Sequence, residues 1–361
     1  MSTRTRIPRT LAATAAEFAV SADVERELVP EVAAGLIDAG FARWFTPAVT
    51  GSFAELADGL REVAVNCPAA AWCGLVWATS GRMAAFLPER GQRDVWEDGP
   101  DVPIAASLMP AGAAERVPGG WRLTGEWHYL SGIDHARWAL LCATAGGEPR
   151  YFAVPAADYV VKDTWFTLGM RGTGSRSAVL EGVTVPEHRT VPQARVWNGV
   201  PGDPRHLCYR VPLTGAHPTM FACPALGAGD AALALWCESV AHPGAGGGHD
   251  EIFARSAGEL DAARLLIART TRALDAGETT AVDAARNARD ASFAADLVLT
   301  AVDRLFRSRG AAVHTEGDPL QRLWRDVRTA TSHAALHPAR NYALYAHAVR
   351  QRATTTETEN R

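Results

Sequence analysis

The chain has 361 residues, of which 47% are hydrophobic, enough to bury a large core in one multilayer unit or in two to three domains. Its formal net charge is −4 and its arginines are interleaved with acidic residues, which gives no electrostatic reason to expect nucleic acid or an anionic membrane as a partner. No apolar run approaches the roughly 20 residues that cross a bilayer, and the first residues lack the apolar stretch of a signal peptide.

The first region, residues 1–103, is predicted to be helical. Apolar residues recur at helical spacing in three segments that end at glycine or proline, namely 24–39, 53–67 and 69–87. The third segment contains Trp72 and is apolar on most sides, so we expect a buried helix. Residues 1–14 are expected to be a frayed end or the first helix.

The second region, residues 104–211, contains short β-rich runs separated by Gly-Gly and proline turns. These runs predict a compact antiparallel β-barrel or sandwich. Residues 186–210 are polar and contain several prolines, and we expect a linker there.

The third region, residues 212–361, is predicted to be helical again. Long amphipathic segments cover residues 223–241, 252–276, 280–309, 320–336 and the chain after Pro338. Short connections, with a flexible loop over residues 244–248, predict a four-helix bundle. The tail over residues 351–361 is expected to be disordered. The sequence therefore predicts an α+β fold with an N-terminal helical domain, a middle β domain and a C-terminal bundle.

The six cysteines lie among apolar neighbours, and no two of them have the spacing of metal ligands. We therefore expect free, buried thiols, as in a reducing cytoplasm, and no metal site.

Two segments of the middle region combine glycines and small hydroxyl residues with an aromatic residue or a histidine. They are residues 125–135, Gly-Glu-Trp-His-Tyr-Leu-Ser-Gly-Ile-Asp-His, and residues 169–175, Gly-Met-Arg-Gly-Thr-Gly-Ser. This composition is typical of backbone that approaches a flat, polar, conjugated ligand. Because both segments belong to the strand-rich region, we expect them to form one site.

These motifs, the Leu-Trp-Arg-Asp-Val run at residues 323–327 and the α–β–α order resemble the acyl-CoA dehydrogenase fold over residues 29–347. The chain is more similar to the oxygen-using branch of that fold, the oxygenase components of two-component flavin monooxygenases. Within this branch it looks most like the actinorhodin-pathway ring hydroxylase, which acts on aromatic polyketides in antibiotic biosynthesis.

The resemblance implies an enzyme that receives reduced flavin, FMNH2 or alternatively FADH2, from a separate reductase. A C4a-hydroperoxide formed with O2 would then hydroxylate a phenolic or quinonoid small molecule. The resemblance also implies a homotetramer whose bundles pack together and complete neighbouring flavin sites.

Two features that the sequence lacks, a glutamate base and a nucleotide-binding motif, help to distinguish the alternative functions. The plain dehydrogenases of this fold keep a glutamate base at places that correspond to residues 218–220 or 336–342, and neither stretch contains a glutamate here. No Gly-x-Gly-x-x-Gly motif follows a predicted strand, so no NAD(P)H domain is expected and another protein should reduce the flavin. N-oxygenation of an amine or amino sugar, an acyl-CoA dehydrogenase with a displaced base, and a flavin-binding scaffold without activity remain alternatives.

The resemblance assigns flavin contacts to both motifs. Ser175 would hydrogen-bond flavin N5 and support the hydroperoxide, with Thr173 beside it, although both hydroxyls could simply cap their own turn. Ser131 and Trp127 are further flavin candidates, and Arg171 could meet a flavin phosphate or a carboxylate. Trp127 could also stack on the substrate or belong to the core.

Other residues are candidates for substrate contact. His135 could polarise a phenol or else bond a nearby carboxylate. His128 is expected on the exterior, because alternate residues of a strand face opposite sides. Trp72 and His217 would line the substrate pocket, although an aromatic residue such as Trp72 more often belongs to a core.

His333 is the candidate general base. It falls on a polar stripe of the predicted helix, formed by Asp326, Thr329, His333 and His337. In the similar secosteroid hydroxylase an aspartate follows the matching histidine by four residues, and His337 takes that place here as a further substrate candidate. The alternative is a solvated helix face or a contact between subunits.

Overall fold

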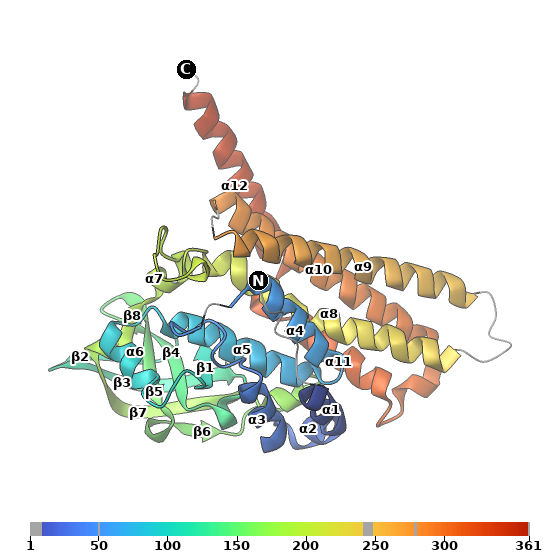
Figure 1. Cartoon of the computed structure of the whole chain (residues 1–361), viewed down its shortest axis with the longest axis horizontal. Helices are drawn as coiled ribbons and strands as arrows, with labels where there is room; N and C mark the ends of the chain where they lie inside the picture. Colours follow the sequence, from blue (N-terminus) through green and yellow to red (C-terminus); the bar gives the residue numbers. More distant parts are fainter. Residues whose placement is uncertain (1–8, 50, 241–247, 278–279, 360–361) are drawn as a thin grey trace.

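The computed structural model describes residues 9–49, 51–240, 248–277 and 280–359. Figure 1 shows the N-terminal helices and the β-sheet on one side of the long C-terminal helices. Residues 1–8 of the predicted frayed end and most of the predicted loop over residues 244–248 lie outside the described residues.

The N-terminal region contains α1 (Arg9–Glu17), α2 (Ala19–Glu25), α3 (Pro30–Asp38), α4 (Phe53–Ala64), α5 (Pro68–Ala84) and α6 (Glu89–Val95). The predicted helix over residues 24–39 is divided, because Arg26 adopts a left-handed conformation and Pro30 begins a new helix. Every residue of α5 is buried, since this helix lies between α4, β1 and α8. The prediction of a buried third helix is confirmed.

The strands are β1 (Ile104–Ser107), β2 (Ala113–Val117), β3 (Gly120–Leu130), β4 (Trp138–Ala145), β5 (Glu148–Pro155), β6 (Val160–Lys162), β7 (Arg176–Pro186) and β8 (Thr190–Pro192). They pair in the order β6-β7-β3-β2-β4-β5-β8, and β1 pairs with β4. The predicted antiparallel pairing needs a correction, because β4 runs parallel to both β1 and β2. The β2–β3 hairpin and the turn after it form the crossover that parallel pairing requires.

The sheet contributes to two apolar cores. Leu140 and Cys142 of β4 belong to the core shared with the helices, whereas Ala139 and Leu141 belong to a separate core within the β region. This alternation is what a strand with two buried faces produces. One face of the sheet is therefore turned toward the helices.

Residues 186–210 are not the expected linker. They include β8 and α7 (Gln193–Asn198), and the indole of Trp197 donates a hydrogen bond of 2.8 Å to the hydroxyl of Tyr151. These elements are short and bounded by prolines, so they leave little periodicity in the sequence.

The bundle consists of α8 (Leu213–Val240), α9 (Gly248–Asp275), α10 (Ala281–Ser308) and α11 (Pro319–Thr331), which pack against one another. α8 begins earlier than predicted and contains Pro218 and Pro224, because burial among neighbouring helices outweighs the two missing backbone hydrogen bonds. By length and composition α8 is apolar enough to cross a membrane, contrary to the expectation from sequence. Since 72% of its apolar window is buried, it is a core helix of the bundle.

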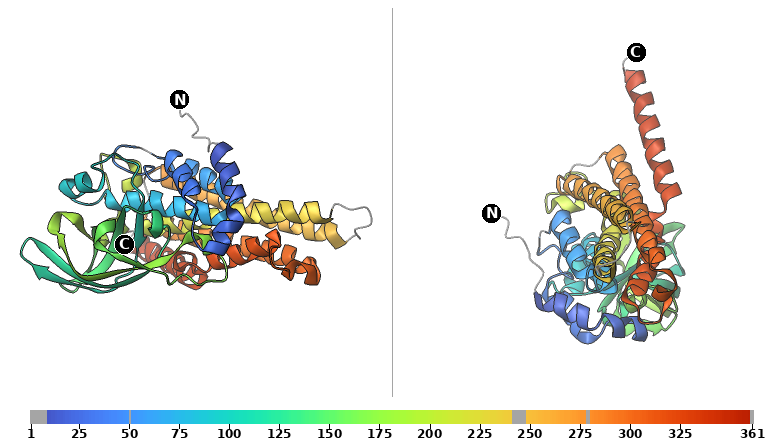
Figure 2. Two further views of the ribbon diagram at one scale, coloured as in Figure 1. Left: turned by 90° about the horizontal axis from the view of Figure 1, so that it is seen from below. Right: turned by 90° about the vertical axis from the view of Figure 1, so that its right-hand side faces the viewer.

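α12 (Pro338–Glu359) contacts α10 and then leaves the body of the molecule, as Figure 1 and the right-hand view of Figure 2 show. Two predictions are corrected here. The helix predicted to reach residue 336 ends at Thr331, and the tail expected to be disordered continues α12 to Glu359.

Candidate active site

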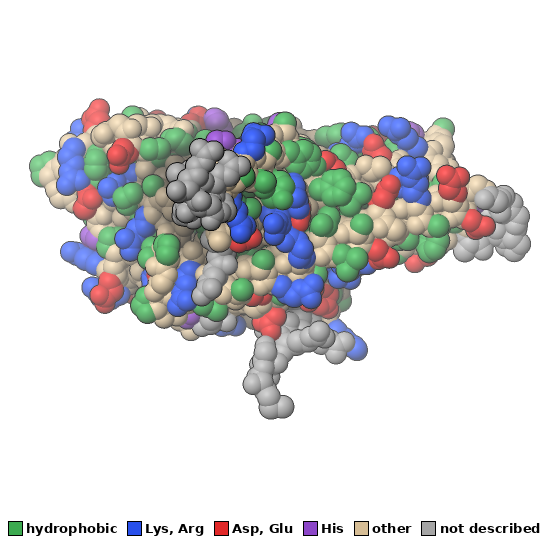
Figure 3. All heavy atoms as spheres, turned by 90° about the horizontal axis from the view of Figure 1, so that it is seen from above, with side chains coloured by type: hydrophobic (Ala, Val, Ile, Leu, Met, Phe, Trp, Pro, Cys, Tyr) green, Lys and Arg blue, Asp and Glu red, His purple; other side chains and the backbone are tan. Residues whose placement is uncertain are grey.

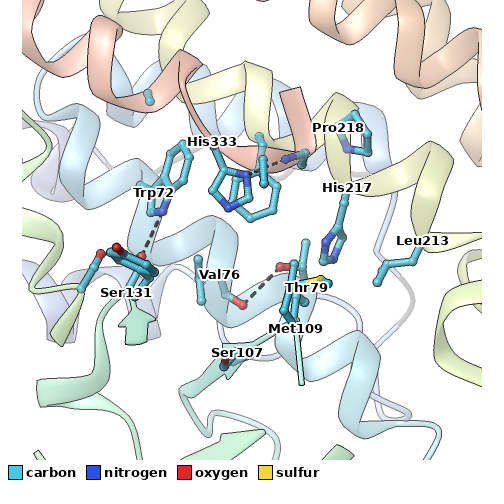
Figure 4. Close-up of a pocket in the computed structure, with 18 of the residues that line it drawn as sticks. Trp72, Val76, Thr79, Ser107, Met109, Ser131, Leu213, His217, Pro218 and His333 are labelled. Atoms are coloured by element: carbon cyan, nitrogen blue, oxygen red, sulfur yellow. Dashed lines mark hydrogen bonds between the residues drawn. The ribbon is translucent and has the colours of Figure 1, made fainter. Parts of the chain in front are cut away.

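A cavity of about 570 Å³ opens where the sheet, α5, α8 and the segment after α11 meet. Figure 4 shows Trp72 and Ser131 on one side of it and His217 and Leu213 on the other, with His333 between them. The first residues of α12 complete its lining. The cavity therefore joins all three regions of the chain.

A chain of hydrogen bonds runs along one end of the cavity. The indole Nε1 of Trp72 donates to Ser131 Oγ at 3.1 Å, and Ser131 Oγ lies 2.7 Å from Ser175 Oγ. Ser175 Oγ lies 2.7 Å from Thr173 Oγ1, which donates to the carbonyl oxygen of Met170 at 2.8 Å. The three hydroxyls line the cavity and are almost fully buried.

The ends of this chain fix its direction, because each hydroxyl has only one hydrogen. The hydrogen of Thr173 is committed to the carbonyl of Met170, so Ser175 must donate to Thr173, and Ser131 must donate to Ser175. The indole N–H at the other end of the chain then supplies the hydrogen that Ser131 accepts. The three hydroxyls consequently offer oxygen lone pairs, and no free hydrogen, to a ligand in the cavity.

Tight backbone contacts place the loop that carries Thr173 and Ser175. Asp326 on α11 accepts the N–H of Met170 at 2.5 Å, and burial raises the pKa of this carboxyl to about 7. Gly169 approaches the carbonyl oxygen of Arg325 so closely that a Cβ atom would lie 2.1 Å from it. Only glycine fits there, which explains one of the motif's glycines.

Aromatic and imidazole rings form the other part of the cavity. The ring of His333 stacks on Phe221 at 4.2 Å between centroids, and His217 meets the edge of the same phenyl ring at 5.5 Å. Trp72 packs edge-on against Phe221 at 4.9 Å and against His333 at 5.4 Å. A flat ligand in this part of the cavity would meet aromatic surface on several sides.

His333 does not occupy a helix as predicted. It follows α11 and caps the next turn, where its Nδ1 accepts the N–H of Ala335 at 3.2 Å. Burial lowers the pKa of His333 to about 4, so the ring is neutral near pH 7 and carries its hydrogen on Nε2. The predicted role as general base therefore needs a correction, because the ring's only lone pair is already used.

Apart from one tyrosine, the ionisable side chains that line the cavity in the described chain are basic. No aspartate or glutamate is found among the described residues that line it, whereas His128, His217, His333 and Arg340 do line it. Burial, together with the charge of Arg82, lowers the pKa of His217 to about 3, and its Nε2 has no hydrogen-bond partner in the described chain. The cavity thus presents the neutral imidazoles of His217 and His333 and, among its described lining residues, no carboxylate.

Two candidates of the first motif lie elsewhere. Trp127 is fully buried in the core of the β region, where its indole donates to the carbonyl of Cys142 at 2.6 Å. The Nε2 atom of His135 lies 2.9 Å from the carbonyl oxygen of Leu28, outside the cavity lining. Both predicted ligand contacts are corrected, because the inward face of β3 takes Trp127 and the turn after Ser131 directs His135 toward the N-terminal helices.

Arg171 and His337 also fall outside the described lining of the cavity. The guanidinium of Arg171 donates to the carbonyl of Asp23 at 2.7 Å and thereby fastens the loop to α2. His337 is exposed, because the predicted polar stripe breaks where α11 ends. The ligand contacts of Arg171 and His337 stay predictions, although neither side chain belongs to the described lining of this cavity, whereas Asp326 from the same stripe supports the loop.

The sequence analysis missed Tyr129. A register shift in β3 between Trp127 and Leu130 turns Tyr129 and His128 toward the cavity, and Tyr129 has a positive φ of 64° and is 74% exposed. His128 lies on the exposed side of the strand, opposite Trp127, as predicted. A bulge of this kind leaves no periodic signal in a sequence. Trp72, Ser131, Thr173, Ser175, His217 and His333 are the predicted site residues that the structure brings together.

Proteins of known family are similar to this chain in sequence. The family model for the C-terminal domain of acyl-CoA dehydrogenases matches residues 219–338. The oxygenase subunit HsaA of a flavin-dependent monooxygenase from Rhodococcus jostii is 33% identical over 337 residues, covering 86% of this chain and 88% of that protein. The oxygenase component of an FADH2-dependent resorcinol hydroxylase from a Rhizobium species is 30% identical over 319 residues, covering 80% and 78%.

A solved structure extends the likeness to the fold. XiaF from a Streptomyces species, in complex with FADH2 and glycerol, matches with a TM-score of 0.89 and 30% identity over 95% of this chain and 93% of that one. The chain therefore belongs to the oxygenase components of flavin-dependent monooxygenases that share the acyl-CoA dehydrogenase fold.

Proposed function

We propose that this enzyme hydroxylates a phenolic or quinonoid compound with fused aromatic rings, such as an aromatic polyketide. Relatives of the chain include hydroxylases of aromatic substrates, and the aromatic walls and 570 Å³ volume of the cavity suit a flat molecule larger than one ring. Reduced flavin supplies two electrons and activates O2, so that one oxygen atom enters the ring and the other leaves as water.

The directed hydroxyl chain is the observation that carries this proposal. The N5 atom of reduced flavin carries a hydrogen, whereas N5 of oxidised flavin offers a lone pair. Ser175 Oγ can only accept, because its own hydrogen is committed to Thr173. It would therefore hold the reduced form, with Ser131 and Thr173 keeping its orientation.

The alternatives fit the cavity less well. N-oxygenation would bring an amine into a site that has no carboxylate among its described lining residues. Acyl-CoA dehydrogenation needs a carboxylate base, which the same lining lacks. We keep both reactions as outcomes that product analysis can reveal.

The reductant comes from a separate component, as the names of the relatives as oxygenase subunits imply. We propose FMNH2 as the flavin, with FADH2 as the alternative. A structure of the same fold at 18% identity holds FMN, and XiaF at 30% identity holds FADH2. Competition between the two reduced flavins for the purified protein would distinguish them.

We also propose a homotetramer in the cytoplasm. α12 projects from the bundle, and Figure 3 shows hydrophobic side chains gathered on this face of the molecule. Leu265, Phe293, Leu344 and Val349 are exposed large apolar residues of these helices. A second copy would cover them. The free cysteines suit a reducing compartment.

The test supplies the purified chain with chemically reduced FMN or FAD, isotopically labelled O2 and a set of naphthols and hydroxynaphthoquinones. We expect one labelled oxygen atom in the product, detected by mass spectrometry, and one flavin oxidised per product formed. Release of peroxide alone with every aromatic compound, or failure to bind either reduced flavin, would contradict the proposed function.

A further inference from the structure

The proposed function leaves open in which ionisation state the phenol enters. We propose that the cavity takes its substrate as an oxyanion, held by the N–H groups of His217 and His333 in the field of the buried Arg82, and that no side chain of the enzyme removes the phenolic proton. The proton leaves to bulk water before binding. This inference rests on the proposed function and specifies its substrate class, namely phenols and hydroxyquinones that are already acidic.

The hydrogen bond from Ala335 is the first argument. Since the N–H of Ala335 donates to Nδ1 of His333, a second hydrogen on this ring would point at the backbone N–H and break the cap. The ring can therefore donate through Nε2, but it cannot take up a proton without disturbing the turn that holds it. It suits an oxygen that already carries a negative charge.

The second argument comes from Arg82 on α5. Its side chain is 1% exposed, and its guanidinium donates to the carbonyl oxygens of Cys208 and Val211, which are neutral. Nη1 has no partner within the described chain, and no carboxylate there pairs with this arginine. A buried charge without a counterion is costly, and an anion nearby would reduce that cost.

Arg82 also acts on the cavity. It lies on the same helix as Thr79 and Met83, which line the cavity, and its charge lowers the pKa of His217. An imidazolium is disfavoured so close to a second positive charge, so His217 stays neutral and can donate a hydrogen bond. The same field favours a negative oxygen between the two rings.

Apart from one tyrosine, the ionisable groups that line the cavity, or lie behind it as Arg82 does, are basic. His333 follows α11, Arg340 lies on α12, His128 lies on β3 and Arg82 lies on α5. Glu126 lies 3.7 Å from Nδ1 of the exposed His128. No carboxylate lines the cavity in the described part of the chain, however, and none pairs there with His217 or His333. The geometry and the charges of the cavity thus both favour a bound oxyanion.

The experiment is a spectroscopic titration of the purified chain with 4-nitro-1-naphthol, whose anion and neutral form differ in colour. The methyl ether, 1-methoxy-4-nitronaphthalene, serves as the matched ligand that cannot ionise. We expect the bound dye to have the anion spectrum, an apparent pKa at least one unit below that of the free dye, and at least tenfold tighter binding than the ether.

The variants His217→Phe and His333→Phe keep an aromatic ring but lack the N–H donor, and each should lose at least half of the shift in the dye's pKa. His314→Phe changes an exposed histidine outside the described cavity lining and should keep the full shift. The proposal is overturned if the wild-type protein shifts the pKa of the dye by less than one unit. It is also overturned if a variant at residue 217 or 333 keeps more than half of the wild-type shift.

This readout is independent of turnover. A dye that binds as the anion while no aromatic compound is hydroxylated would refute the proposed function and leave the inference standing. Hydroxylation of phenols by a protein that binds the neutral dye would support the proposed function and refute the inference.

Discussion

Replacement of Ser175 by alanine gives the sharpest test of the hydroxyl chain. The substitution removes the oxygen that accepts from Ser131 and the hydrogen that Thr173 accepts. A reduced flavin would then lose the acceptor for its N5–H in a buried site. Leaving a buried donor without a partner costs about 1–3 kcal/mol, which corresponds to a loss in affinity of about fivefold to 150-fold.

Oxidised flavin should respond differently. Once Ser175 is gone, the hydrogen of Ser131 has no fixed acceptor and can turn toward the cavity. It could then donate to the lone pair on N5 of oxidised flavin, so the affinity for this form should stay the same or rise slightly. The dissociation constant of oxidised flavin divided by that of reduced flavin should therefore fall by about fivefold or more.

Flavin fluorescence titrations, aerobic for the oxidised form and anaerobic for the reduced form, measure this ratio. Ser256→Ala is the matched control, because Ser256 is also buried and hydrogen-bonded, to Arg304, but lies outside the described cavity lining. Equal weakening of both redox forms by Ser175→Ala would refute the argument, since it would mean that the serine provides shape and no hydrogen-bond direction.

Three further predictions follow from named contacts. Trp72→Phe removes the donor that orients Ser131, so reduced flavin should bind about 2- to 10-fold more weakly in the same titration, while product formation with bound flavin persists. Burial raises the pKa of Asp326 from 3.8 to about 7, so between these pH values the folded state keeps a proton that the unfolded state releases. The free energy of unfolding should therefore fall by up to about 4 kcal/mol as pH rises from 4 to 7. Asp326→Asn, which keeps an acceptor for the N–H of Met170, should flatten this slope in urea denaturation. Val349→Asp on the projecting α12 should give a smaller species in sedimentation velocity, and an unchanged sedimentation coefficient would count against assembly through this helix.

The sequence was sufficient for the parts of the site that depend on local composition. Ser131, Thr173 and Ser175 stand in glycine-containing turns, and a turn of this kind brings Thr173 and Ser175 together locally. The contact between Ser131 and Ser175 depends in addition on the pairing of β3 with β7. Trp72 is predicted from a buried helix and His217 from its place near the junction of two regions, and their convergence in one cavity follows from packing that periodicity does not specify.

The misplaced residues show what a linear pattern leaves out. Trp127, the predicted ligand contact, lies in the core, whereas Tyr129, for which the sequence predicts no role, faces the cavity after a register shift in β3 that depends on the pairing with β7. The predicted stripe of His333 and His337 assumed a continuous helix, whereas α11 ends at Thr331. The end of a helix and the register of a strand are both decided by tertiary contacts.

The two ends of the cavity have opposite hydrogen-bonding character. This difference would decide which end takes the flavin and which end takes the substrate. The hydroxyl end, from Ser131 to Thr173, can only accept, so it suits the N–H of a reduced cofactor. The imidazole end, with His333 and His217, donates and has no carboxylate among its described neighbours, so it suits an oxyanion. A phenolate bound there would have its electron-rich ring between the two ends of the same cavity, on the side of the flavin. Reversal of the two ligands would place acceptor against acceptor and donor against donor, which is costly in a buried cavity.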